Sequence, residues 1–231
     1  MSIITDELEK GIRDNGYDKM ILEIEKAADS EILEERCCIA AMLEDYKNKH
    51  SEKILIKLLS DESLSVRTNA VQSLALFGSE TVFNTLKNLL LTVKSPLLKG
   101  STVLSISYSC PRAERENIIR LFTSMLESEG NIFVRIKLQC ALFILGDTNA
   151  MKEIMKLYNR YGCSDKCTIL NDLADMLERG AGDIEYIKAF SCVAKNNLPH
   201  FNVRGAYERL KSVVDSVYGL VADRRPITYA V

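Results

Sequence analysis

The sequence predicts an all-α fold, a right-handed α-solenoid superhelix built from about six helix pairs. Three observations lead to this prediction: a sequence pattern recurs along the chain, turn residues are scarce, and apolar residues follow helical spacing. The 231 residues include only 11 glycines and 4 prolines. Because strands need frequent turns, so few of these residues favour long helices joined by short connections.

Internal repetition is clearest between residues 64–78, LSVRTNAVQSLALFG, and residues 132–146, IFVRIKLQCALFILG. Both contain Val-Arg, then apolar residues 3, 7 and 10 positions after the arginine, then a glycine at position 11. These offsets keep one helix face apolar, and the glycine suits a left-handed C-terminal cap. The segments lie 68 residues apart, twice 34, so a weaker copy is expected between them, and residues 95–106 fill that place.

A basic residue opens the second helix of each expected pair. These residues are Arg36, Arg67, Lys99, Arg135, Lys166 and Arg204. The pairs are expected at about 18–47, 50–77, 79–109, 112–145, 147–178 and 183–219, after a short capping helix near 4–14. Each pair alone would expose an apolar face, and stacking on its neighbours buries it. We expect a single solenoid domain over residues 1–221 and an extended C-terminal tail over residues 222–231.

Residues 61–78, DESLSVRTNAVQSLALFG, resemble the HEAT-repeat (armadillo-like) family in their Asp turn, Val-Arg and Ala-x-x-x-Leu pattern. The pattern is good again at 134–146 and looser elsewhere. The resemblance implies the solenoid architecture, and HEAT-like arrays act as scaffolds and as binding partners for proteins, less often for DNA. It also implies a structural ladder in which Arg67 reaches Asp61 at a helix junction and ties adjacent repeats together, with Arg135 in the same position of its repeat.

Charge is distributed unevenly although the formal net charge is only -2. Residues 1–62 carry 16 acidic and 9 basic side chains, a net charge of -7. Residues 63–143 carry 5 acidic and 9 basic side chains, a net charge of +4, and the remainder carries a net charge of +1. No global basic field indicates a nucleic-acid or membrane partner, so the acidic first third is the main electrostatic feature.

No set of residues for a chemical reaction is apparent, and we expect neither an enzyme nor a cofactor. The two histidines, His50 and His200, lie in no recognisable motif, which disfavours nucleophilic catalysis. Cys163 and Cys167 have no second cysteine pair to complete a zinc site, so core packing is expected for them. Some DNA alkylation-repair glycosylases have a HEAT-like fold, but this chain lacks tryptophan and a basic field, and nothing in it supports the tetrapyrrole site of a HEAT-like bilin lyase.

The sequence also predicts a cytoplasmic location and no contact with membranes. Residues 1–7 lack the basic start of a secretory signal, and the longest apolar runs have about five residues. Seven cysteines, an odd number in mostly apolar stretches, fit reduced, buried thiols in the cytosol. We expect a monomer apart from its partner.

The predicted function is non-enzymatic protein binding, through the concave surface or the acidic first third. On the second helices, polar residues off the apolar stripe are candidate contacts: Asn69, Gln72, Ser73, Ser101, Ser105, Tyr108 and Lys137. The acidic candidates are Glu34, Glu35, Glu44 and Asp45. A specific hypothesis is a cytosolic immunity (antitoxin-like) protein that neutralises a basic toxin domain. The alternatives are a scaffold or adaptor for endogenous proteins, and nucleic-acid binding through Arg112, Arg115 and Arg120.

Overall fold

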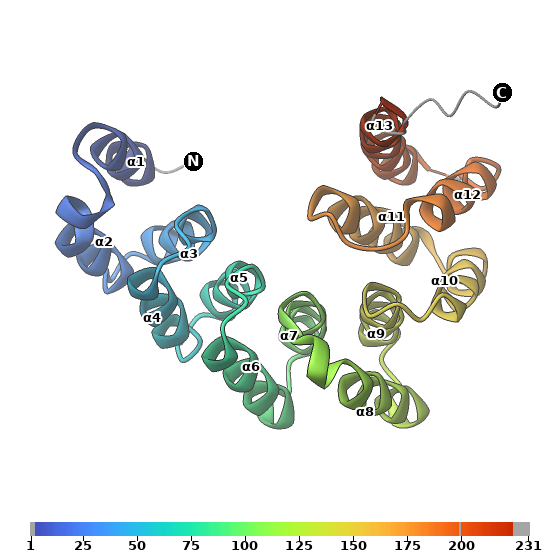
Figure 1. The fold of residues 1–231 in the computed structure, drawn as a ribbon, viewed down its shortest axis with the longest axis horizontal. Coiled ribbons are helices and arrows are strands. Elements are labelled where there is room, and N and C mark those ends of the chain that lie inside the picture. Colours follow the sequence, from blue (N-terminus) through green and yellow to red (C-terminus); the bar gives the residue numbers. More distant parts are fainter. Residues whose placement is uncertain (1–2, 199, 224–231) are drawn as a thin grey trace, which may run out of the picture. The chain divides into compact units, whose positions relative to one another are not determined.

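The computed structural model describes residues 3–198 and 200–223 as a succession of helices joined by short turns (Figure 1). In order they are α1 (Ile3–Asn15), α2 (Ile21–Ala28), α3 (Leu33–Met42), α4 (Lys49–Leu58), α5 (Leu64–Leu74), α6 (Glu80–Thr92), α7 (Pro96–Ser109), α8 (Arg115–Ser128), α9 (Ile132–Ile144), α10 (Asn149–Arg160), α11 (Cys163–Glu178), α12 (Ile184–Ala194) and α13 (Phe201–Asp223). These residues contain no strand, which confirms the predicted all-α solenoid class.

The predicted pairs correspond to α2/α3, α4/α5, α6/α7, α8/α9, α10/α11 and α12/α13, and α1 is the predicted N-terminal helix. The ends differ in detail. Three 3-10 segments, η1 (Tyr17–Met20), η2 (Leu43–Asp45) and η3 (Arg112–Glu114), occupy ends that we expected to be α-helical. Helix α13 continues to Asp223, two residues past the predicted end of the domain. Residues 224–231 of the predicted tail lie outside the described residues.

Capping residues explain where many helices begin. The side chains of Asn48, Ser79, Ser95, Asn131 and Asp183 accept hydrogen bonds from backbone N–H groups of the first turn that follows them. These N–H groups have no partner within the helix, so the caps stabilise its start. The capping residues in the short connections therefore determine where many of the helices start.

Contacts within the chain divide it into two compact units, Met1–Arg115 and Glu116–Val231. In the first unit the second helices stack in a row, since α3 contacts α5 and α5 contacts α7. In the second unit α11 contacts both α9 and α13. The handedness of the superhelix and the single domain over residues 1–221 stay predictions.

Second helices carry the core because they are covered on more than one side. Helix α5 buries Val66, Ala70, Val71 and Leu74, and α9 buries seven of its thirteen residues. First helices are covered mainly on one face, and α8 buries only Ile118 and Phe122. Within the part of the chain that is described, no helix is long and apolar enough to cross a bilayer.

Candidate protein-binding surface

The arginines that open the second helices bind the turn that precedes them. Arg36 donates to the carbonyl oxygen of Ser30 (2.8 Å), Arg67 to that of Asp61 (2.5 Å) and Arg135 to that of Glu129 (2.9 Å). In all three cases the acceptor lies six residues before the arginine. Carbonyl groups after a helix end have lost their helical partners, and a guanidinium supplies donors for them. This shared contact is the structural role of the arginine in the repeated pattern.

The expected pairing of Arg67 with the Asp61 side chain is different in the structure. Nε of Arg36, from the preceding pair, donates to Oδ2 of Asp61 at 2.8 Å, and Nη2 donates to Oδ1 at 3.3 Å. Asp61 Oδ1 also accepts from the backbone N–H of Ser63 at 2.8 Å. The carboxylate thus binds Arg36 of the neighbouring pair while it also caps this turn. Arg67 therefore ties together the two helices of its own pair, and Arg36 ties adjacent pairs together.

The Asp61 carboxylate is held in its charged form. Burial disfavours the charge, but the hydrogen bonds from Arg36 and Ser63 outweigh burial, so the pKa of Asp61 lies below its ordinary value. The other carboxylate on Arg36, Glu62, accepts from Nη2 at 3.2 Å, and its side chain is 87% exposed. The two carboxylates thus share one arginine in very different environments.

The remaining members of the basic series do not form a common surface. Lys166 is buried, donates to Oδ1 of Asn197 at 2.9 Å and lies over the ring of Tyr158. Lys99 is half-buried and Arg204 is exposed. Because most of these cations serve contacts within the fold, the series is not available as a continuous track for a phosphate backbone.

Three of the seven predicted polar contacts on the second helices are buried, which corrects the prediction for them. Ser73, Ser101 and Ser105 are only 1%, 5% and 2% exposed. Ser73 donates to the carbonyl oxygen of Ala40 at 2.7 Å, and Asn69 to that of Cys37 at 3.1 Å. Small residues occupy these positions because adjacent second helices stack closely. The side chains of Ser73 and Asn69 supply hydrogen bonds to backbone carbonyl oxygens of the neighbouring helix.

Lys137 is also part of an internal contact. Its Nζ donates to Oδ1 of Asp172 at 2.5 Å and links α9 to α11, with side chains 11% and 7% exposed. Burial raises the pKa of Asp172, and the contact with Lys137 opposes this shift. Of the predicted contacts on second helices, Gln72 is exposed and Tyr108 is half-buried.

The acidic candidates in the first third lie at or near the surface. Glu34 and Asp45 are exposed, whereas Glu35 and Glu44 are half-buried. Exposed apolar side chains, which the sequence analysis missed, occur in the same stretch: Leu22 is 75% exposed, Ile32 53% and Leu33 40%. A signal for them was present in the sequence. Leu22 falls outside the buried stripe of α2, which consists of Ile24, Ala27 and Ala28, and Ile32 lies among acidic residues just before α3 begins.

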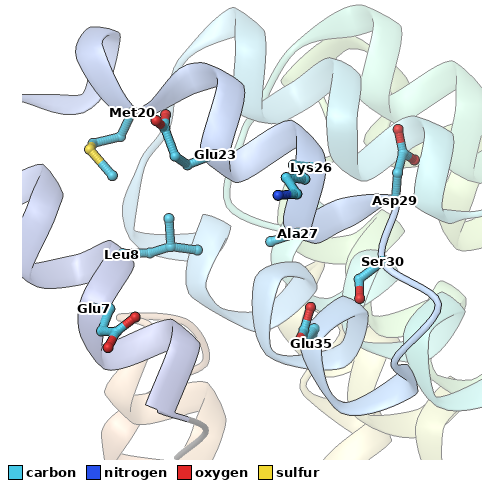
Figure 2. A pocket seen from close by; sticks show the side chains of 9 residues that line it. All are labelled: Glu7, Leu8, Met20, Glu23, Lys26, Ala27, Asp29, Ser30 and Glu35. Carbon is cyan, nitrogen blue, oxygen red and sulfur yellow. The ribbon is translucent and has the colours of Figure 1, made fainter.

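A cavity of about 550 Å³ lies between α1, α2 and the start of α3 (Figure 2). Its apolar lining consists of Leu8 and Ala27, both buried, and Met20, which lies against α1 where Gly11 leaves room. A Cβ at Gly11 would approach Cε of Met20 to 2.7 Å. The polar lining residues are Glu7, Glu23, Lys26, Asp29, Ser30 and Glu35. No sequence signal reveals this cavity, because it depends on how α1 packs on the first pair.

A second cavity, of about 480 Å³, lies between α11 and α13. Phe201 at its edge is 88% exposed. Its only charged lining residue, Arg209, is already bound to Asp175 at 2.5 Å and to Glu178 at 2.7 Å. The charge at this cavity is therefore neutralised within the fold.

The thiols are less buried than the sequence analysis expected. Cys140 is buried and Cys192 is exposed, while the five others, including Cys163 and Cys167, are half-buried. Burial raises the pKa of Cys140 well above its ordinary value, and the charge of Asp172 beside it acts in the same direction. Among the residues with described positions, no group of three or more His, Cys, Asp or Glu side chains is placed to hold a metal ion.

Residues 21–107 match a family described as HEAT repeats, which confirms the predicted resemblance. The match spans α2 to α7. Among solved structures, the chain is similar to a chain in the complex of CpcE and CpcF of phycocyanin lyase from Nostoc sp. PCC7120. The sequence identity is 15% and the TM-score 0.44, over 83% of this chain and 92% of that chain. No curated protein matches the chain in sequence.

Proposed function

We propose that this protein is a non-enzymatic binding module that recognises a basic protein through its acidic first third. The observation that carries the proposal is the surface of α2 and α3, where exposed carboxylates accompany exposed apolar side chains. Leu22, Ile32 and Leu33 supply the apolar groups, and Glu23, Glu31 and Glu34 supply carboxylates without an ion pair among the described residues. HEAT repeats are helical interaction modules, and this match covers the same helices.

The chemistry of this surface matches a partner with an apolar centre and basic surroundings. Apolar side chains that leave water provide most of the affinity of an interface. Carboxylates at its edge select a positively charged partner and accelerate the encounter. The net charge of -7 over residues 1–62 extends this attraction beyond direct contact.

Within this class, we propose an immunity role in the cytosol, in which the protein neutralises a toxin domain. A cationic nuclease domain has the complementary charge, and masking its basic surface would exclude its nucleic-acid substrate. A scaffold that holds endogenous proteins would use the same surface. The immunity role differs from it by predicting a single tight stoichiometric partner.

Nucleic-acid binding is the second candidate, because Arg112, Arg115 and Arg120 are exposed. Neutralising phosphates releases counterions, so such binding would weaken steeply with salt. An interface that depends on Leu22 and Ile32 would lose much less affinity over the same range of salt.

The test is affinity capture of the tagged full chain from its native cells, followed by binding measurements with the captured partner. Leu22→Ser and Glu31→Lys are the test variants. Leu91→Ser and Glu127→Lys are matched controls, since Leu91 is 78% exposed and Glu127 is exposed, both outside the first third. We expect Leu22→Ser to weaken binding by roughly ten-fold, the effect of about 1.4 kcal/mol at an interface anchor.

Glu31→Lys should mainly slow association, and the controls should bind normally. A tight protein complex that is indifferent to both test variants would contradict the proposed surface. Nucleic acid that is released by modest salt would instead favour the second candidate.

A further inference from the structure

The cavity between α1, α2 and α3 has an excess of negative charge. Four carboxylates line it, and Lys26 is its only cation. Asp29 is already engaged, because Nζ of Lys57 lies 2.5 and 2.7 Å from its two oxygens. Glu7, Glu23 and Glu35 form no ion pair within the described part of the chain. Three carboxylates and one ammonium group thus line a shared cavity, with Glu7, Glu23 and Glu35 at separate places around it (Figure 2).

Part of the cavity wall is apolar and buried. Leu8 and Ala27 are each 6% exposed, and the Met20 thioether completes this lining. A volume of about 550 Å³ falls within the range of about 300–1,000 Å³ that is common for ligand pockets. A cavity lined by both apolar side chains and carboxylates suits a group with an alkyl stem and a positive end.

The arrangement of the carboxylates favours an ammonium group over a guanidinium. Glu7 comes from α1, Glu23 from α2 and Glu35 from α3, so they approach the cavity from three directions. An ammonium group has three donors that can turn toward separate acceptors, whereas a guanidinium prefers one carboxylate in its own plane.

We propose that this cavity receives a lysine side chain of the partner protein. Its methylene groups would lie on Leu8, Met20 and Ala27, and its ammonium group among Glu7, Glu23 and Glu35. The inference rests on the proposed function and adds the residue of the partner that anchors it. Lys26 partly occupies the same negative field, so it competes with the incoming lysine.

The test uses the full chain labelled with ¹³C at its methionine methyl groups. Met20 lines the cavity, and the other six methionines serve as internal references. The Met20 signal is assigned with Met20→Leu. The probes are N-acetyl-lysine-N-methylamide and its norleucine analogue, which has the same alkyl stem without the charge, and n-hexylamine.

We expect the lysine probe to shift the Met20 signal saturably, and the norleucine analogue to bind at least five-fold more weakly. Glu23→Gln should weaken lysine binding about two- to five-fold, as expected for one partly exposed charge contact. Lys26→Gln should strengthen it by a similar factor, because the competing cation is gone. Glu127→Gln, an exposed glutamate outside the cavity, should leave it unchanged.

Several outcomes would overturn the inference. Equal binding of the lysine and norleucine probes would show an apolar pocket without charge selection. Binding of n-hexylamine alone would show a site for free amines, and equal shifts at all methionines would show non-specific contact. If the probes fail while partner capture still depends on Leu22, the cavity assignment falls and the proposed function stands. If the lysine probe binds with charge selection but partner capture does not depend on Leu22, the cavity assignment stands and the proposed surface falls.

Discussion

At the scale of single residues, Lys137 and Asp172 form a buried ion pair that links α9 to α11. The two side chains are almost withdrawn from water, and Cys140 adds its thiol to the same contact. Removing one partner of a buried pair leaves an uncompensated charge, whereas replacing both partners by apolar groups is often neutral or stabilising. The pair therefore specifies how α9 meets α11 more than it stabilises their contact.

Lys137→Met should lower the free energy of unfolding by about 3 kcal/mol at pH 7. The pKa of Asp172 is already raised in the fold, and losing Lys137 should raise it further. In the variant, the Asp172 carboxyl of the native state then binds a proton more tightly than the same group in the unfolded chain. The loss of unfolding free energy caused by Lys137→Met should therefore shrink as the pH falls toward 4. Urea unfolding at several pH values measures this dependence.

The double variant Lys137→Met with Asp172→Leu is the control for this measurement. It should recover most of the lost stability and show no such dependence on pH. A Lys137→Met protein that is equally destabilised at pH 7 and pH 4 would show that the Asp172 charge is not the cause.

At the scale of elements, the repeated pattern works through helix ends. The glycines that were expected to cap the second helices, Gly78 and Gly146, have φ values of 62° and 93°. These angles lie in the left-handed region, which is costly for residues with a Cβ. The arginine eleven residues earlier closes the turn at the other end of the same helix. A single short pattern thus defines both ends of a second helix.

Gly78→Ala should lower the free energy of unfolding by about 1 kcal/mol. No atom lies within 4 Å of the position that a Cβ would take, so the cost is confined to the backbone. Gly130→Ala is the matched control, because Gly130 also has open space but no positive φ. It should be neutral or stabilising by about 0.5 kcal/mol. Equal destabilisation in both variants, measured by urea unfolding, would reject the cap explanation.

At the scale of the whole molecule, the contacts between neighbouring pairs are best seen in the first unit. Arg36 with Asp61, Ser73 with Ala40 and Asn69 with Cys37 all join the first pair to the second. In such an array, the stability of one pair depends mainly on the pairs beside it. Damage at one junction should therefore remain largely local.

Asp61→Asn should lower the opening free energy of α2 to α5 by about 1–3 kcal/mol, since a charged hydrogen-bonded contact is lost. Hydrogen exchange read by mass spectrometry should show faster exchange there, with much smaller changes in α12 and α13. Because the pKa of Asp61 is lowered in the fold, its charged form stabilises the native state only above that pKa. The difference in opening free energy between wild type and Asp61→Asn should therefore disappear as the pH falls below about 4.

Glu62→Gln is the control for that experiment, because Glu62 binds the same arginine from an exposed position. It should change the opening free energy by less than about 0.5 kcal/mol. Uniformly faster exchange along the chain in Asp61→Asn would contradict the nearest-neighbour view.

The sequence by itself determined the class of fold, the six pairs and most of their ends. These features depend on short-range information: the spacing of apolar residues, the caps at Asn48, Ser79 and Asn131, and the glycines at 78 and 146. Residues 21–107, which match HEAT repeats, contain one of the two clearest copies of this pattern, at 64–78.

Only the tertiary structure decided which polar residues are available to a partner. Ser73 and Lys137 were expected on the surface, but Ser73 packs against α3 of the preceding pair and Lys137 pairs with Asp172 on α11 of the next pair. Asp61 was assigned to Arg67, but the preceding pair supplies Arg36 instead. The cavity lined by Glu7 and Glu23 exists because of the way α1 packs. Spacing along one helix places a side chain on a face, and only the neighbouring element decides whether that face is buried, paired or open to solvent.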